Sequence, residues 1–280
     1  DLHLSLRRQR QMCIRDSNTP IIDFHAHGGS WKNRGFSDDP KLYLKQMNLT
    51  GVDKTCINSI FFGDAKHANN LVQNRFVSAY PDRFIGVAFV TPHYPEECIY
   101  ELDRSFDQLN FKFLKIYPDY YGQPSDSEGY KPIMEWANHK GIAIMAHTRF
   151  PSDPPGTPTM STSDFVFKRF EKFTTNYPNI KWVIAHAGSA FNKENLNWAT
   201  SAAVELPNIW LETSSSGNGL YAVYDAVVNH GLGDRILFGS DVPILDYRSQ
   251  ISKIVTANIS NEDKKKILGL NAIKLLNLKI

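Results

Sequence analysis

The sequence predicts a single-domain (β/α)₈ TIM barrel, and three observations lead to this fold class. Short apolar runs alternate with longer amphipathic stretches, which is the pattern of parallel strands connected by helices. Eight such units follow residue 18, and an eight-unit barrel usually takes about 250 residues. Polar residues, four of them histidines, stand where several runs end. A doubly wound open sheet is the alternative, but it usually carries a glycine-rich phosphate loop after its first strand, and Gly28-Gly29 alone is a poor one.

The eight strands are expected at the apolar runs, which are short and rich in β-branched and aromatic residues. In chain order they lie at 21–27, 52–62, 84–90, 111–117, 142–147, 181–186, 209–213 and 236–240.

Each strand is followed by an expected helix, and local signals mark several of the helix ends. The segment Ser37-Asp38-Asp39-Pro40 supplies a capping side chain and a first-turn proline, and Gly51 and Gly141 end two helices. The expected helices cover 40–50, 66–80, 95–109, 131–140, 164–177, 193–205 and 221–229, with two more at 249–257 and 261–276.

Residues 1–17 do not share this pattern, because they have neither a hydrophobic period nor turn signals. As a peptide they could be a basic arm for nucleic acid or a targeting segment. Residues 7–17 are better explained as translated sequencing adapter. The string TGT-ATA-AGA-GAC-AG, which resembles the mosaic end of transposon-library adapters, encodes 13–16 and begins a serine codon. We therefore predict that residues 1–17 are not native, and we assign the barrel domain to residues 18–280.

The composition argues against proteins that bind nucleic acid or that bind or span membranes. Residues 1–17 hold four arginines and two aspartates, so the formal net charge falls from +2 to 0 without them. No global basicity remains to attract nucleic acid or an anionic membrane. No apolar run approaches the ~20 residues needed to cross a membrane. Cys56 and Cys98, the remaining cysteines, are expected to be buried free thiols, which suits a cytoplasmic protein.

Active-site residues of a barrel lie at the carboxyl ends of its strands. The sequence places these polar residues there: His25, His27, Lys115, His147, His186, Glu212 and Asp241. Because side chains alternate along a strand, His25 and His27 share a face and can reach one ion. One histidine at a strand end is usually structural, but four with a carboxylate at one rim predict a metal site. Imidazoles with one carboxylate suit zinc, manganese or iron better than calcium or magnesium.

These positions resemble the amidohydrolase superfamily, and most closely the amidohydrolase 2 branch of metal-dependent hydrolases and aromatic-acid decarboxylases. The motifs that carry the resemblance are Asp-x-His-x-His at 23–27, the histidine at 147, Ala-His-Ala-Gly at 185–188, Gly-Ser-Asp-x-Pro at 239–243 and the closing segment 267–276. The resemblance covers residues 21–278. It implies the barrel and a metal-dependent enzyme, but it does not identify a substrate.

The resemblance also implies roles. His25, His27, His147 and Asp241 would bind one divalent metal, with zinc expected ahead of manganese, and His186 would act as acid/base or polarise the bond under attack. The main expectation is a hydrolase of a small organic acid, ester, lactone or amide, which uses metal-activated water while Asp241 moves the proton. One alternative is non-oxidative decarboxylation of an aromatic or enol carboxylic acid. Another is an inactive barrel used for binding, against which the intact ligand set argues.

Lys115 leaves the metal count open. The segment 113–118 resembles the fourth strand of dihydroorotase-like relatives, in which a carbamylated lysine bridges two metals. In that case His186 would also be a ligand. An ion-paired or uncharged lysine, or a lysine that contacts substrate directly, is weighed ahead of carbamylation because motif transfer of this kind often fails.

Three further residues are substrate or support candidates. Arg149 could bind a substrate carboxylate through two hydrogen bonds or form an ion pair within its loop. Glu212 could orient a ligand histidine or be a structural carboxylate. Trp31 could line the pocket or cover the top of the barrel. A small molecule is the expected partner, and a homodimer is one assembly that the resemblance allows.

Overall fold

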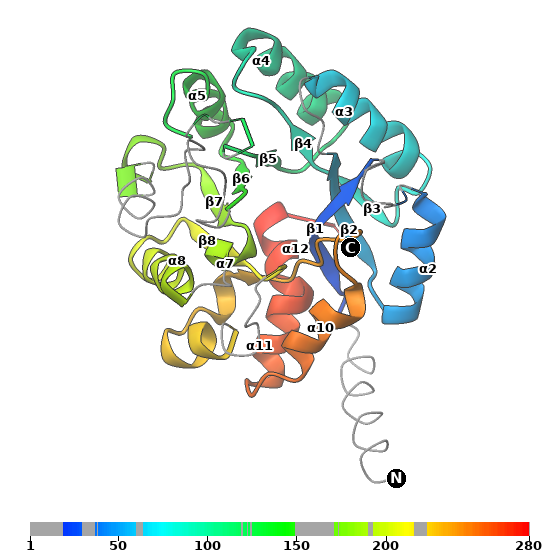
Figure 1. The fold of residues 1–280 in the computed structure, drawn as a ribbon, viewed down its shortest axis with the longest axis vertical. Coiled ribbons are helices and arrows are strands. Elements are labelled where there is room, and N and C mark those ends of the chain that lie inside the picture. Colours follow the sequence, from blue (N-terminus) through cyan, green and yellow to red (C-terminus); the bar gives the residue numbers. More distant parts are fainter. Residues whose placement is uncertain are drawn as a thin grey trace.

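The barrel predicted from the sequence is present in the computed structural model, with the helices outside the ring of strands (Figure 1). The structure describes residues 19–29, 37, 39–59, 64–118, 120–121, 123, 125–148, 171–172, 174–189, 193–215 and 223–279. Within these ranges, no helix is long and apolar enough to cross a membrane. Residues 1–17 lie outside the described residues, so their non-native origin stays a prediction.

Among the described residues, nine parallel strand segments form the eight barrel strands. They are β1 (Ile22–Gly28), β2 (Lys54–Ser59), β3 (Phe84–Gly86), β4 (Ala88–Phe89), β5 (Leu114–Ile116), β6 (Ala143–Ala146), β7 (Lys181–Ile184), β8 (Ile209–Glu212) and β9 (Ile236–Leu237). Residue 87 separates β3 from β4, which are two halves of the third barrel strand. The ring closes between β9 and β1, where Phe24 N donates to Phe238 O at 2.8 Å and Asp241 N donates to His25 O at 2.7 Å.

The helices begin and end close to the predicted signals. They include α2 (Pro40–Thr50), α3 (Ala65–Val72), α4 (Pro95–Asp103), α5 (Lys131–Lys140), α8 (Lys193–Glu205), α10 (Tyr247–Val255), α11 (Asn261–Lys265) and α12 (Asn271–Leu276). Short π-helical or 3₁₀ segments continue or connect them: η2 (Gln73–Val77), η3 (Arg104–Gln108), η4 (Asp225–Asn229), η5 (Gly233–Arg235) and η6 (Lys266–Leu270). Asp39 caps α2, and Gly51 and Gly141 end α2 and α5 in the left-handed conformation (φ 78° and 67°), as predicted. Most of the helix predicted at 164–177 lies outside the described residues.

The core has two layers. One fills the barrel interior, where the rings of Phe24 and Phe113 stack with centroids 4.3 Å apart, and α12 adds Ala272 to it. The other layer lies between the strands and the surrounding helices. Cys56 is in the interior layer and Cys98 in the outer one; both are buried and unbridged, which confirms the prediction of free thiols.

β1 contains an irregularity that positions the site. Its pairing register with β2 shifts between Asp23 and Ala26. Phe24 therefore packs in the barrel interior while Ala26 packs in the outer layer, although regular alternation would put them on the same face. In an unbroken strand, His25 would point away from the interior that Phe24 fills. The shift turns His25 and His27 inward to the mouth of the barrel, and such bulges commonly aim side chains at active sites.

Candidate metal centre

Two histidines of β1 lie close to an aspartate in the segment that follows β9. His27 Nε2 lies 2.9 Å from Asp241 Oδ1, and His25 Nε2 lies 3.9 Å from the same oxygen. All three side chains are buried. Two ligand atoms on one ion, each about 2.1 Å from it, are at most about 4.2 Å apart. The separations and the chemistry of the donors therefore fit a divalent metal ion held by His25, His27 and Asp241.

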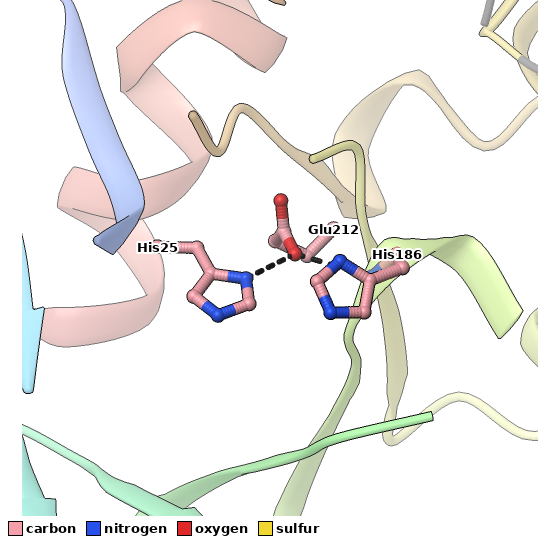
Figure 2. Close-up of side chains that lie close together, drawn as sticks. All are labelled: His25, His186 and Glu212. Atoms are coloured by element: carbon pink, nitrogen blue, oxygen red, sulfur yellow. Dashed lines mark hydrogen bonds and ion pairs between the residues drawn. The ribbon is translucent and has the colours of Figure 1, made fainter. Parts of the chain in front are cut away.

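Glu212, at the end of β8, lies behind His25. Its Oε2 accepts hydrogen bonds from Ser214 Oγ at 2.9 Å and His186 N at 3.2 Å and lies 2.7 Å from His25 Nδ1, while its Oε1 accepts from Ser214 N. Figure 2 shows His25 and His186 on either side of this carboxylate, each with its second ring nitrogen turned away from it. Glu212 thus lies where a carboxylate that orients a ligand histidine is found.

The other two predicted histidines lie beside this group. The ring of His186 is 5.0 Å from that of His25 and 5.1 Å from that of His147, between centroids. His147 also packs against Tyr120, with centroids 4.7 Å apart. Among the described residues, the groups with metal-ligand spacing include His186 but not His147. The structure therefore brings all four histidines together and ties two of them directly to Asp241.

Lys115 is fully buried at the end of β5. Its Nζ lies 3.1 Å from His25 Nε2, the nitrogen that faces Asp241, and 5.3 Å from the centroid of the Tyr117 ring. The side chain of Lys115 therefore directly contacts a candidate metal ligand.

Several contributors were not predicted from the sequence. Tyr117 OH accepts a hydrogen bond from Asn58 Nδ2 at 2.6 Å and lies 3.5 Å from His27 Nδ1. Ser215 Oγ donates to Asp241 Oδ2 at 2.6 Å. Tyr117 follows Lys115 by two positions, so strand alternation could have placed it on the same face. Nothing in the sequence pattern distinguishes Ser215 from the serines next to it.

Gly239 makes room for Glu212. A Cβ atom at this position would overlap Glu212 Oε1 and would lie 2.9 Å from His25 Cβ. Any larger residue would push the carboxylate from its place behind His25, so the glycine of the Gly-Ser-Asp motif has a steric role in the site.

Burial and neighbouring charges separate the acids and bases of the site. Burial alone would raise the pKa of Asp241, but the hydrogen bond from His27 and the nearby histidines hold that pKa well below its usual value. Burial lowers the pKa of His186 to about 3, so its imidazole is neutral. Burial raises the pKa of Asp23 to about 8 despite hydrogen bonds from Ser240. Asp241 is therefore an ionised carboxylate, and Asp23 is largely in its acid form at neutral pH.

Left-handed backbone conformations occur at three residues of the site. His186, Ser215 and Asp241 have φ values of 58°, 50° and 59°. Such conformations cost of order 1–3 kcal/mol each in non-glycine residues and tend to occur at functional sites. A sequence pattern does not reveal these conformations. Arg149 and Trp31, the remaining substrate candidates, lie outside the described residues.

The family model described as Amidohydrolase matches residues 22–278. The chain belongs to the amidohydrolase 2 family. This confirms the resemblance that the strand-end motifs indicate. A search of curated protein sequences gives no match.

Solved structures similar to this amidohydrolase 2 protein include three decarboxylases. A 2,6-dihydroxybenzoate decarboxylase bound to 2,6-dihydroxybenzoate is 20% identical, with a TM-score of 0.72, over 93% of this chain and all of the other. The 5-carboxyvanillate decarboxylase of Sphingomonas paucimobilis is 18% identical (TM-score 0.72; 94% of this chain, 100% of the other). A dihydroxybenzoic acid decarboxylase of Polaromonas sp. JS666, with bound manganese and 2-nitroresorcinol, is 21% identical (TM-score 0.68; 93% and 97%). At these identities the matches establish a shared fold.

Proposed function

We propose that the protein is a metal-dependent, non-oxidative decarboxylase of an aromatic hydroxy acid. The observation that carries this proposal is that a buried lysine and a group of aromatic rings share the barrel mouth with the His25–His27–Asp241 triad. The proposal takes the decarboxylase alternative ahead of the hydrolase expectation, because the surroundings of the triad suit a planar anion better than a neutral amide or ester.

The aromatic side chains form a wall on one side of the site. This aromatic wall consists of Tyr117, Tyr120 and His147. The two tyrosine rings stack at 5.4 Å with 15° between their planes, and His147 packs on Tyr120. Flat rings at this spacing offer a surface on which a further ring can stack.

The charges of the described residues favour an anionic substrate. The carboxylates of Glu212 and Asp241 are balanced by Lys115 and by half-buried Lys253. Burial lowers the pKa of Lys253 to about 8, and its Nζ donates to Thr213 O at 3.2 Å. A divalent ion would therefore give the site a net positive charge. A carboxylate with an adjacent hydroxyl group matches that charge and could reach Lys115.

His25, His27 and Asp241 would hold the metal, with His147 as the further ligand that the family resemblance implies. When bound, a divalent ion supplies positive charge and open coordination positions for substrate oxygen atoms. The similar structures support this assignment, since one decarboxylase contains manganese and an aromatic inhibitor and another contains its aromatic acid. We propose manganese or zinc for this chain.

Decarboxylation requires a proton on the ring carbon that carries the carboxylate. The carbon–carbon bond then breaks, its electron pair returns to the ring, and carbon dioxide leaves. We assign the proton transfer to His186, whose neutral ring holds Nδ1 3.1 Å from Ser214 O. Its Nε2 would accept the proton of the substrate hydroxyl and pass it to the ring carbon. Solvent then protonates the remaining phenolate, so one proton is consumed overall.

Carbon dioxide release tests the proposal. The full chain, loaded with Mn²⁺ or Zn²⁺ in parallel, is incubated with hydroxybenzoic acids and with the methyl esters and amides of the same acids. We expect carbon dioxide and the corresponding phenol from the acids, and a loss of turnover with retained metal in His186→Asn. Hydrolysis of the esters or amides without carbon dioxide from any acid would support a hydrolase instead. If the purified protein holds no metal, and if adding either metal changes neither its thermal stability nor its activity, an inactive barrel would be supported.

A further inference from the structure

We infer that Glu212 and Ser214 form one orienting unit that keeps the ring proton of both His25 and His186 on Nδ1, and that the group His25–His186–Glu212 is not a second metal site. The inference rests on the proposed metal site, because it assigns the tautomer of one of its ligands. It concerns positioning residues, and its test does not depend on the reaction.

The acceptor positions of Glu212 are filled by the protein. The two oxygens of a carboxylate accept about four hydrogen bonds. Four donors surround them: the ring of His25, the hydroxyl and backbone amide of Ser214, and the backbone amide of His186. Glu212 is fully buried, so water does not compete for these positions. A metal ion at this group would have to displace a hydrogen bond from a carboxylate already in use.

This arrangement determines the tautomer of His25. Both backbone amides can only donate, so Glu212 is the acceptor throughout the group and His25 Nδ1 must carry its proton. The lone pair of His25 is then on Nε2, the atom that lies 3.9 Å from Asp241 Oδ1. A carboxylate that accepts from one nitrogen of a ligand histidine makes the other nitrogen a better donor to a metal.

Ser214 determines the tautomer of His186 in a similar way. Its carbonyl oxygen, which can only accept, lies 3.1 Å from His186 Nδ1. Its hydroxyl donates to Glu212 Oε2 and lies 3.0 Å from Nδ1 of both His186 and His25. His186 therefore also carries its proton on Nδ1. The two second nitrogens, which face away from Glu212 in Figure 2, are both acceptors. At the start of the reaction His186 can take a proton from the substrate but cannot give one.

The chain contains a matched control. Glu101, on α4 in the outer layer, is also a buried glutamate, and it accepts from Arg104 at 2.7 Å and from Ser105 Oγ at 3.3 Å. Ser105 is buried as well. Glu101→Gln and Ser105→Ala thus repeat the chemical changes of Glu212→Gln and Ser214→Ala at a place without candidate metal ligands.

The test combines metal affinity with NMR of ¹⁵N-histidine-labelled protein loaded with diamagnetic Zn²⁺. In the wild type we expect one bound ion per chain and an Nδ1-bound proton in both rings. Glu212→Gln should weaken zinc binding by about 10–100-fold, the usual effect of losing such a partner, and should shift the His25 resonances. Ser214→Ala should shift the ring resonances of His186 more than those of His25. Glu101→Gln and Ser105→Ala should leave zinc affinity and both rings as in the wild type.

The inference is overturned if either ring carries its proton on Nε2, if Glu212→Gln binds zinc as tightly as Glu101→Gln, or if the wild type binds two ions and Glu212→Gln loses one of them. If Glu212→Gln does not fold, the tautomers of the wild-type rings and the histidine resonances of Ser214→Ala still test the inference. A chain that binds zinc as expected but releases no carbon dioxide contradicts the proposed function alone. If the chain binds no zinc, the tautomers of the unloaded protein still test the orienting unit.

Discussion

The two ring nitrogens of His25 have different partners. Nδ1 faces the carboxylate of Glu212 at 2.7 Å, and Nε2 faces Lys115 and Asp241. A buried imidazole with a fixed partner on one nitrogen is pre-organised to offer the other to an ion. The chemistry of the site therefore depends on Glu212, which contacts the ring nitrogen of His25 that is turned away from Asp241.

Asp241→Asn tests the ligand set. The amide keeps the shape of the side chain but removes the charge between the two histidines, so metal affinity should fall by more than the roughly 10–100-fold that loss of an outer partner costs. Ser215→Ala is the matched control, since it removes only the hydrogen bond to Asp241 Oδ2, and its effect should stay within that range. Calorimetric titration with Mn²⁺ gives both values. Unchanged affinity in Asp241→Asn would contradict the assignment.

Gly239→Ala tests the steric role of Gly239. Its new methyl group would overlap Glu212 and press on His25, so we expect weaker metal binding and a loss of about 1–3 kcal/mol in unfolding free energy, as is common for overpacking. Gly141→Ala is the control, because its Cβ would meet nothing within 4 Å although its backbone is left-handed. It should lose stability but bind metal normally. Equal metal affinity in the two variants would argue against this role for Gly239.

The residue types of the site were predictable, but their hydrogen bonds were not. Four histidines, a lysine and two acids at strand ends predict a metal site on a barrel because the fold brings strand ends together. The resemblance implied Asp241 as a ligand, and Glu212 was a candidate to orient a ligand histidine, but the hydrogen bonds that hold each acid in place depend on loop conformations such as the left-handed turn at Asp241. That information is in the contacts of Ser214 and Gly239 rather than in any spacing along the chain.

At the scale of elements, the junction of β1 and β9 holds the site together. Asp23 on β1 accepts hydrogen bonds from Ser240 N at 2.8 Å, from Ser240 Oγ at 2.7 Å and from His25 N at 3.1 Å. Asp23 is the last paired residue before the register shift of β1, and His25 lies within the shifted segment. The sequence predicted both strands and most helix ends. It did not predict the shift, because pairing with β2 rather than local pattern determines it.

Asp23→Asn and Asp23→Ala separate hydrogen bonding from charge at this junction. The amide can accept from both backbone groups and donate to Ser240 Oγ, as the protonated acid does, so the unfolding free energy of Asp23→Asn at pH 4 should stay within about 1 kcal/mol of the wild type. Asp23→Ala should lose about 3 kcal/mol or more, because it leaves buried amides unsatisfied. Urea denaturation measures both, and equal losses would show that the hydrogen bonds do not hold the junction.

The raised pKa of Asp23 adds a pH dependence with a defined sign. The folded state holds the proton up to about pH 8, whereas the unfolded state loses it near pH 4. The contribution of this group to stability is therefore complete below about pH 4 and declines as the pH rises towards 8. Asp23→Asn lacks this decline, so the stability difference between the two proteins should shift in favour of the variant over that range.

For the whole molecule, the two core layers should open separately. Cys56 lies inside the barrel, whereas Cys98 lies on the buried face of α4. Burial raises the pKa of the Cys98 thiol to about 11 and that of Cys56 well above its usual value. With Cys13 changed to serine, both thiols should resist a thiol reagent at pH 8 in the native state. Cys98 should react first as urea is added, because opening one helix costs less than opening the barrel. Simultaneous reaction would show that the layers unfold as one unit.

The central claim is that β1 and β9 supply a single metal site that Glu212 supports from behind. Anomalous diffraction from crystals of the Mn²⁺-loaded full chain tests it most directly. The result we predict is one manganese peak per chain, bonded to His25, His27 and Asp241, with Glu212 still bonded to the opposite nitrogen of His25 and not to the ion. A peak on Glu212, or two peaks bridged at Lys115, would contradict the claim.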